Sequence, residues 1–123
     1  MDPKELIKYI DYTSLNFNDE IDAMKNFIEV AKKFELPPAA VCLDAYYAEE
    51  LKEGLLESSI KSCVVACDFP NGKIRSVLKF NEIKDLVHLG IDEIDIVLPY
   101  DAQKNKDYFI SELTQIRRLM PRT

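Results

Sequence analysis

Four short apolar segments alternate with four longer helical patterns along this chain, and this alternation constrains its fold more than any other feature. The apolar segments cover residues 11–15, 39–43, 61–69 and 92–98. The segments with helical spacing of apolar residues cover residues 16–35, 44–56, 74–89 and 102–120. Strands that alternate with helices in this way predict a parallel sheet with right-handed crossovers.

Individual residues mark where these elements begin and end. Pro3 lies in the first turn of a predicted leading helix over residues 1–9. Asp44 suits the start of the second long helix, and Gly90 suits the end of the third. An asparagine cap is expected to open the helix of residues 16–35. The predicted apolar face of that helix consists of Ile21, Met24, Phe27, Ile28, Ala31 and Phe34.

Two architectures fit this order of elements. The strands are almost continuously apolar, as parallel strands buried on both faces are. One possibility is an open sheet of the flavodoxin type, and the other is half of a (β/α)8 barrel, which needs about 250 residues when complete. With 123 residues, we expect a single domain: a leading helix over 1–9, then four βα units over 10–123.

The charge and hydropathy of the chain exclude several classes of partner. The net charge is −6 and no cluster of Lys and Arg is dense, so neither nucleic acid nor an anionic membrane is an expected partner. No apolar run approaches the roughly 18–20 residues that span a bilayer, and the N-terminus has no signal-peptide core. We therefore expect a cytoplasmic protein.

The three cysteines, Cys42, Cys63 and Cys67, all lie in strand-like segments. On one strand, Cys63 and Cys67 would share a face about 13 Å apart, too far for a disulfide. A single histidine, His88, argues against a Cys/His zinc site. We expect all three cysteines to be small buried residues, and we expect no metal.

Asp95 is the sharpest candidate for chemistry, because a carboxylate in a buried strand is costly unless it is paired or hydrogen-bonded. Side chains alternate along a strand. One predicted face carries Glu93, Asp95 and Val97, and the opposite, helix-covered face carries Ile94, Ile96 and Leu98. Asp95 should therefore face the inside of a barrel. The alternative is a structural salt bridge to a lysine.

Three other positions are candidates with competing interpretations. Asp11 opens the first strand with Thr13 on its face, and it is either a site carboxylate or a turn residue. Cys42 is either a nucleophile or a packed residue, and the absence of a histidine in a plausible partner strand favours packing. Lys73 follows a turn where active-site loops gather, but a solvated surface lysine is the favoured interpretation.

The strand ends, taken in order, resemble one family. The segments IDYTSLN (10–16), AAVCLDAYY (39–47), DFPNG (68–72) and GIDEIDIVLPY (90–100) are together similar to deoxyribose-phosphate aldolase. The resemblance implies a (β/α)8 barrel that reversibly cleaves 2-deoxyribose 5-phosphate to acetaldehyde and glyceraldehyde 3-phosphate. It also implies a class I mechanism, in which a lysine forms a Schiff base and neither cofactor nor metal is needed.

The same resemblance assigns roles to particular residues. It implies that Asp95 relays protons through a water molecule, that Asp11 supports it, and that Cys42 and Thr13 line the substrate pocket. The chain departs from the family at Tyr12, which replaces the usual histidine of the opening motif.

The lysines of the family lie on the sixth and seventh strands, outside these 123 residues. We therefore expect an N-terminal half that is inactive alone. The alternative is a non-catalytic, self-associating half-barrel or a module that binds a small ligand.

A half-barrel has two exposed sheet edges and an open face, on which Val65, Val97 and the cysteines would meet water. We expect these surfaces to be covered in a homodimer or larger homo-oligomer, or by a complementary C-terminal half. If the assembly is active, its small-molecule partner is a phosphorylated sugar or an aldehyde.

Overall fold

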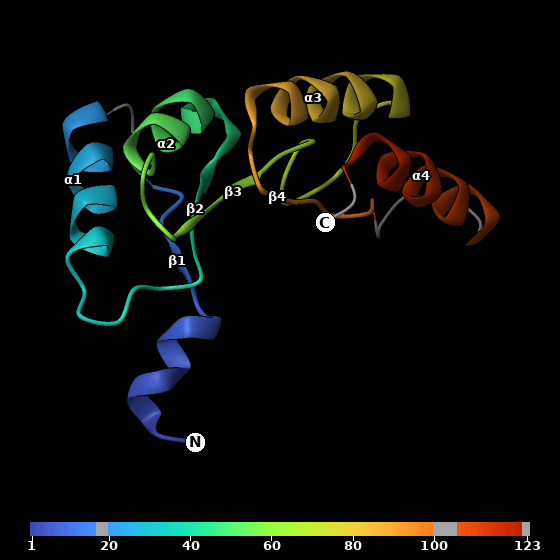
Figure 1. Cartoon of the computed structure of the whole chain (residues 1–123). Coiled ribbons are helices and arrows are strands. Elements are labelled where there is room, and N and C mark those ends of the chain that lie inside the picture. The colour runs from blue at the N-terminus through green and yellow to red at the C-terminus, as the bar shows by residue number, and fades with distance from the viewer. Residues whose placement is uncertain (17–19, 100–105, 122–123) are drawn as a thin grey trace.

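A computed structural model describes residues 1–16, 20–99 and 106–121 of the chain. Its strands form one parallel sheet in the order β1-β2-β3-β4 (Figure 1). The strands are β1 (Asp11–Thr13), β2 (Ala40–Asp44), β3 (Lys61–Val65) and β4 (Glu93–Asp95). The helices are η1 (Pro3–Tyr9), α1 (Ile21–Lys32), η2 (Ala45–Tyr47), α2 (Ala48–Gly54), α3 (Ser76–Leu89) and α4 (Lys106–Leu119).

The two faces of the sheet differ in which elements pack against them. On one face, strand residues such as Val41, Val64 and Ile94 form the main core with side chains from α1 to α4. The buried cluster on the other face contains only strand residues, with Phe69 packed against it. A flavodoxin-type sheet has helices on both faces and a different strand order. The structure is therefore the (βα)4 half of a TIM barrel.

Several local predictions are confirmed and others are wrong. Asp44 caps η2 by accepting a hydrogen bond from the backbone N–H of Tyr46, and Gly90 ends α3 in a left-handed conformation with φ 93°. The asparagine cap is wrong, because the N-cap of α1 is Glu20 and its side chain makes no capping bond. On the predicted apolar face of α1, Ile21 is 44% exposed.

The third strand is shorter than predicted, and this changes the position of Cys67. β3 ends at Val65, and both Cys67 (φ 61°) and Asp68 (φ 60°) adopt left-handed backbone conformations. The Cys67 side chain consequently joins the helix-side core, whereas Cys63 belongs to the opposite cluster. The prediction that these two cysteines share a face is therefore wrong. All three cysteines are buried and free.

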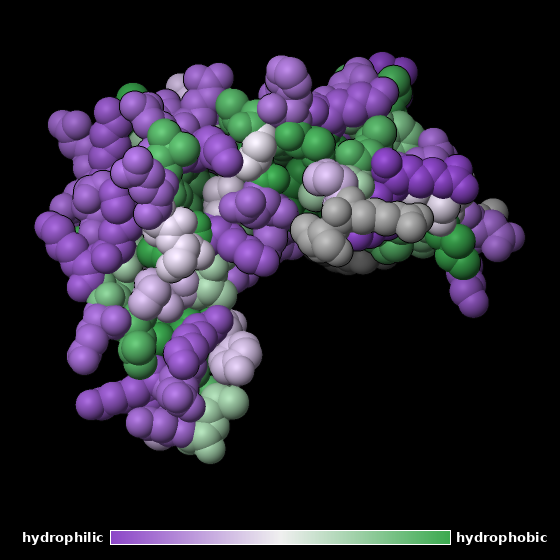
Figure 2. Space-filling view, in the orientation of Figure 1, coloured by the Kyte–Doolittle hydropathy of each residue, from purple (hydrophilic) through white to green (hydrophobic). Residues whose placement is uncertain are grey.

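The leading helix is a 3-10 helix, and it buries none of its residues. It lies apart from the four α-helices, below β1 in Figure 1, and its surface is largely hydrophilic in Figure 2. Within the described ranges, no helix combines the length and hydropathy that crossing a bilayer would require.

A buried ion pair joins α3 to α4. Lys79 Nζ donates a hydrogen bond of 2.9 Å to Glu112 Oε1, and the two side chains are 1% and 2% exposed. Ser76 Oγ donates to Glu112 Oε2 at 2.6 Å, and the Tyr108 hydroxyl donates to the same oxygen at 3.3 Å. Both carboxylate oxygens are thus satisfied, as burial of this charge requires.

This network predicts an acid-sensitive contribution to stability. Burial raises the pKa of Glu112, but hydrogen bonds from Ser76 and Lys79 and the charge of Lys79 outweigh it, so the pKa lies below its ordinary value. A depressed pKa adds stability above the unfolded-state value of about 4.5, and this stability is lost as the pH falls through the folded-state value. Below about pH 4.5, the unfolding free energy should therefore fall more steeply in the wild type than in Glu112→Gln. Urea denaturation across this pH range tests the difference, and equal slopes would contradict it.

Candidate functional site

Polar and sulfur-containing side chains are aligned in rows across the open face of the sheet. The pairing of the four strands places Thr13, Cys42, Cys63 and Glu93 in one row. The next row toward the carboxyl ends of the strands contains Asp44, Val65 and Asp95. Residues paired in a parallel sheet point to the same face, so each row brings together side chains that are distant in sequence.

Asp95 is the last residue of β4, and its side chain is exposed on the open face. Its neighbours Ile94 and Ile96 pack against the helix-side core, as the alternation predicted. Asp95 lies close enough to Cys42 for its charge to oppose ionisation of that thiol. Among the described residues Asp95 forms no salt bridge, so the alternative of a structural pairing with a lysine finds no support there.

Cys42 and Cys63 are paired on the adjacent strands β2 and β3, and both are buried. The neighbouring Cys63 thiol lowers the pKa of Cys42 and outweighs burial and the charges of Asp95 and Asp11, which act in the opposite direction. The neighbouring Cys42 thiol, together with burial, raises the pKa of Cys63. Thr13 is paired with Cys42 in the sheet, and its hydroxyl donates to the Asp11 carbonyl at 2.9 Å. The structure therefore brings the two predicted pocket residues, Cys42 and Thr13, together.

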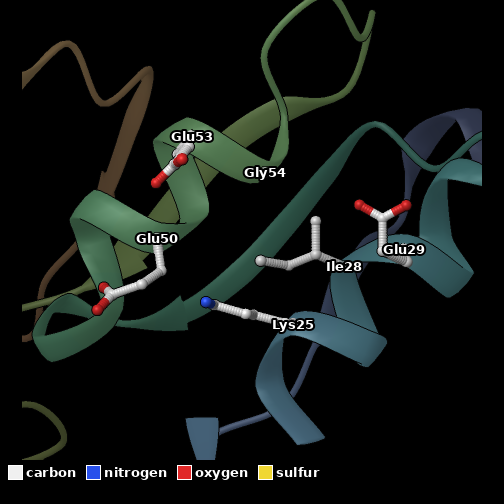
Figure 3. Close-up of a pocket in the computed structure, with 6 residues that line it drawn as sticks. All are labelled: Lys25, Ile28, Glu29, Glu50, Glu53 and Gly54. Atoms are coloured by element: carbon white, nitrogen blue, oxygen red, sulfur yellow. The ribbon is translucent and has the colours of Figure 1, made fainter. Parts of the chain in front are cut away.

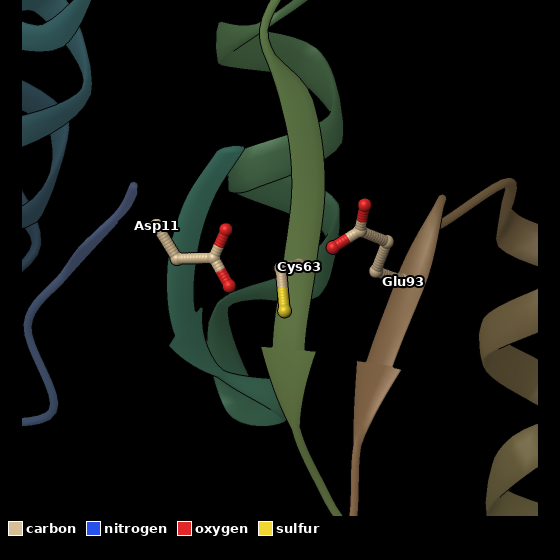
Figure 4. Close-up of side chains that lie close together, drawn as sticks. All are labelled: Asp11, Cys63 and Glu93. Atoms are coloured by element: carbon tan, nitrogen blue, oxygen red, sulfur yellow. The ribbon is translucent and has the colours of Figure 1, made fainter. Parts of the chain in front are cut away.

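Two carboxylates flank this thiol pair. Figure 4 shows the Asp11 and Glu93 carboxylates pointing toward Cys63 from opposite sides. One ligand atom from each of the three residues lies within 4.8 Å of the others. The sequence predicts Cys63 on the open face only as a small residue, without these neighbours. Its position beside Glu93 depends on strand register, which the sequence does not reveal.

The open face is less apolar at its surface than predicted. Cys42, Cys63 and Val65 are only 3%, 3% and 4% exposed, so the prediction that they would meet water is wrong. The exposed side chains on this face are instead polar, and they include Asp11 and Asp95. The small buried residues of this face are partly covered by Phe69, which packs against them.

Two lysines lie near this face. Lys61 is the first residue of β3, and it is exposed at the end of the strand opposite to Asp95. Lys73 lies in the loop after β3, where its backbone N–H donates to Asp68 Oδ2 at 3.0 Å. The loop is further closed by hydrogen bonds from Asn71 and Gly72 to the Asp68 carbonyl.

One cavity lies in the helical layer, and another at the strand ends adjoins the open face at Asp44 and Val65. A groove of about 310 Å³ lies between α1 and α2 (Figure 3), in the outer layer of helices. A recess of about 350 Å³ lies at the carboxyl ends of β2 and β3. Its lining includes four acidic residues, Asp44, Asp68, Glu82 and Asp85. Because like charges repel, this acidic recess is unsuited to a phosphate group.

Comparison with known proteins identifies relatives for this arrangement. The chain is 33% identical over 118 residues to the deoxyribose-phosphate aldolase of Dictyoglomus turgidum, covering 94% of this chain and 52% of that protein. It is 35% identical over 118 residues to the enzyme of the same name from Caldicellulosiruptor saccharolyticus, with the same coverage. No protein-family model matches the chain.

Solved structures that resemble this chain are also aldolases. The aldolase QR15 superposes with a TM-score of 0.82 at 28% identity, over 95% of this chain and 52% of that one. The deoxyribose-phosphate aldolase of Aeropyrum pernix, described as a unique tetramer, has a TM-score of 0.82 at 21% identity and shares the fold. The chain thus spans about half the length of the relatives it matches. The predicted resemblance and the half-barrel fold are both confirmed.

Proposed function

Because the chain corresponds to about half of a deoxyribose-phosphate aldolase, we propose that it supplies the acidic half of a lysine-dependent aldolase site. The observation that carries this proposal is the position of Asp95. It lies at the carboxyl end of a parallel strand, on the open face beside Cys42, and it has no salt-bridge partner among the described residues. Carboxyl ends of barrel strands are where catalytic groups gather.

In the proposed reaction, a lysine of the complementary half attacks the carbonyl carbon of 2-deoxyribose 5-phosphate. Loss of water gives the Schiff base, and its positive charge withdraws electrons as the carbon–carbon bond breaks. Asp95 relays protons through a water molecule during these steps, and Asp11 supports it. Cys42 and Thr13 line the substrate pocket. The C3 hydroxyl loses its proton, glyceraldehyde 3-phosphate leaves, and the lysine retains an enamine. Protonation of the enamine on carbon gives an imine, and water hydrolyses this imine to acetaldehyde and the free lysine.

Two features of the described residues support the expectation that this half is inactive alone. Lys61 is at the wrong end of its strand, and Lys79 is engaged with Glu112 in the helical layer. The recess at the strand ends is acidic, so binding of the substrate phosphate also requires residues from the complementary half.

The edges of the sheet indicate how the assembly closes. β1 and β4 each pair on one side only within the described sheet, and an unpaired parallel edge is a template for another strand. In a homodimer, β4 of each copy would pair with β1 of the other and close an eight-stranded barrel. A complementary C-terminal half would close the same edges and add the lysines. A self-associating half-barrel without activity is the second candidate, favoured by the two sheet edges, β1 and β4, that pair on one side only within the described sheet.

Complementation tests the proposal. The chain would be mixed with the part of the Dictyoglomus turgidum aldolase that it does not match, and cleavage of 2-deoxyribose 5-phosphate would be followed by acetaldehyde release. We expect neither half to be active alone and the mixture to be active. In the mixture, Asp95→Asn should lower kcat by about 100-fold, the size of effect expected from loss of a general acid–base group.

The control is Asp22→Asn, which removes an exposed carboxylate from the outer helix α1 and should leave activity unchanged. Sedimentation of each sample reports the assembly that forms. A stable mixed complex without activity, or full activity in Asp95→Asn, would contradict the proposed role. A dimer of this chain that ignores the second half would favour the non-catalytic candidate.

A further inference from the structure

Three carboxylates, Asp92, Glu93 and Asp95, lie in or next to β4, and of these the proposed function uses only Asp95. Asp92 comes directly before the strand and is hydrogen-bonded to Ser62, the second residue of β3. We propose that Asp92 is a positioning residue, whose contact with Ser62 fixes the register of β4 against β3 and so places Asp95 on the open face. The inference rests on the proposed function for the role of Asp95, but the register can be measured without any activity.

The contact between Ser62 and Asp92 consists of three hydrogen bonds. The backbone N–H of Ser62 donates to Asp92 Oδ2 at 2.9 Å, and Ser62 Oγ donates to the same oxygen at 3.1 Å. In return, the backbone N–H of Asp92 donates to Ser62 Oγ at 3.0 Å. Ser62 is only 2% exposed, so removal of the Asp92 carboxylate would leave a buried N–H without its acceptor.

The strand itself provides few restraints on its register. β4 contains only residues Glu93–Asp95, and these pair with Cys63–Val65 of β3. β4 is also the last strand of the described sheet, so no second neighbour restrains it there. A shift of one residue moves every side chain of a strand to the opposite face. Such a shift in β4 would turn Asp95 toward the helix-side core.

The alternation of side chains connects the contact to Asp95. Asp92 and Asp95 are three positions apart, so their side chains leave an extended chain on opposite faces. Ser62 directly precedes Cys63, which belongs to the open-face cluster, so the Ser62 side chain lies on the helix side with that of Val64. The Asp92 carboxylate therefore meets Ser62 on the helix side, and this arrangement leaves Asp95 on the open face.

Other contacts restrain the chain on both sides of Asp92. Lys52 Nζ, from α2, donates to the Gly90 carbonyl at 3.0 Å, two residues before Asp92. At the far end of β4, the backbone N–H of Ala66 donates to the Asp95 carbonyl at 3.1 Å. Because this last bond depends on the observed register, protection of the Ala66 N–H from exchange reports on that register directly.

The first test compares hydrogen exchange of the Ala66 N–H in the wild-type chain and in Asp92→Ala, followed by NMR. The N–H of Ile28, in α1 and 1% exposed, is the internal reference for global unfolding. Relative to this reference, Ala66 should exchange about tenfold faster in Asp92→Ala, as expected from loss of the acceptor of a buried N–H. Asp92→Asn should keep the wild-type ratio, because its amide oxygen can accept the same hydrogen bonds.

The second test is activity in the mixture with the complementary half. Asp92→Ala should lower kcat about tenfold and change KM by less than about twofold, because a displaced Asp95 affects the reaction steps rather than substrate binding. Asp92→Asn should restore kcat. Ser62→Ala should reproduce the loss, and the double variant should lose little more, because both substitutions break one contact. The control Asp22→Ala removes an exposed carboxylate from α1 and should change neither readout.

Circular dichroism establishes that each variant is folded, and Ser62→Ala, which alters a single oxygen atom, keeps the test decisive if Asp92→Ala is not. Unchanged Ala66 exchange in the folded variants would overturn the proposal. So would faster exchange accompanied by an unchanged kcat. If the wild-type mixture has no activity, the proposed aldolase function fails, whereas the exchange rates still decide whether Asp92 fixes the register of β4.

Discussion

Replacing Lys79 with methionine should destabilise the protein by about 3–5 kcal/mol, because it leaves a buried carboxylate without its counter-charge. Lys79 and Glu112 are 1% and 2% exposed, and Lys79 Nζ is the donor to Glu112 Oε1. Methionine resembles the lysine side chain in length, so the loss of packing is small and the unpaired charge accounts for most of the effect. Urea denaturation at neutral pH measures the change.

A second substitution separates charge from packing. Glu112→Gln removes the remaining charge but keeps an oxygen that can accept hydrogen bonds from Ser76 and Tyr108. The double variant should therefore be more stable than the sum of the two single variants predicts, by about 1 kcal/mol or more. Lys84→Met, an exposed position on the same helix, is the control and should change stability by less than about 0.5 kcal/mol. Additive effects would show that the pair is not energetically coupled.

This ion pair illustrates what the sequence could not predict. A lysine in an amphipathic helix normally indicates a solvated face, and the burial of Lys79 depends on an acid 33 residues later on another helix. The contact between Cys42 and Cys63 likewise depends on strand register, which is set by packing of the whole sheet. Neither property is encoded in a local pattern.

Local patterns were predicted well. The alternation in β4 placed Ile94 toward the helices and Asp95 on the open face, because strand geometry fixes a period of two residues. Asp44 and Gly90 were recognised because capping depends on the nearest backbone groups alone. Four repeats of strand and helix were sufficient to predict a parallel sheet, and the family motifs at the strand ends distinguished the barrel half from an open sheet.

Element ends were predicted less well. The sequence from Lys61 to Phe69 is apolar enough for one long strand, yet β3 ends at Val65. The left-handed residues Cys67 and Asp68 turn the chain there. The Cys67 backbone N–H donates to Glu82 Oε2 of α3 at 3.0 Å, so this turn is stabilised by a tertiary contact. Apolar composition alone carries no information about such a contact.

The loop that follows this turn leads to the second large effect. Gly72→Ala should destabilise the protein by about 3–4 kcal/mol, combining an unfavourable backbone conformation with a steric clash. Gly72 has φ +68°, and a Cβ atom there would lie 2.1 Å from the carbonyl oxygen of Val97. The atom in the way belongs to the backbone just after β4, so no side-chain rotation relieves the contact.

The loop also has little freedom to move away. The backbone N–H of Gly72 donates to the Asp68 carbonyl at 2.7 Å, and the Lys73 N–H donates to the Asp68 carboxylate. Displacing Val97 instead would shift the end of β4, two residues from Asp95, so activity in the complemented assembly should fall as well. Gly54→Ala is the matched control: its Cβ would meet only the Ile28 side chain at 3.0 Å, and its effect should be within about 1 kcal/mol of zero. Thermal and urea denaturation measure both variants, and equal stability of the two would mean that the Gly72 loop and β4 do not touch as described.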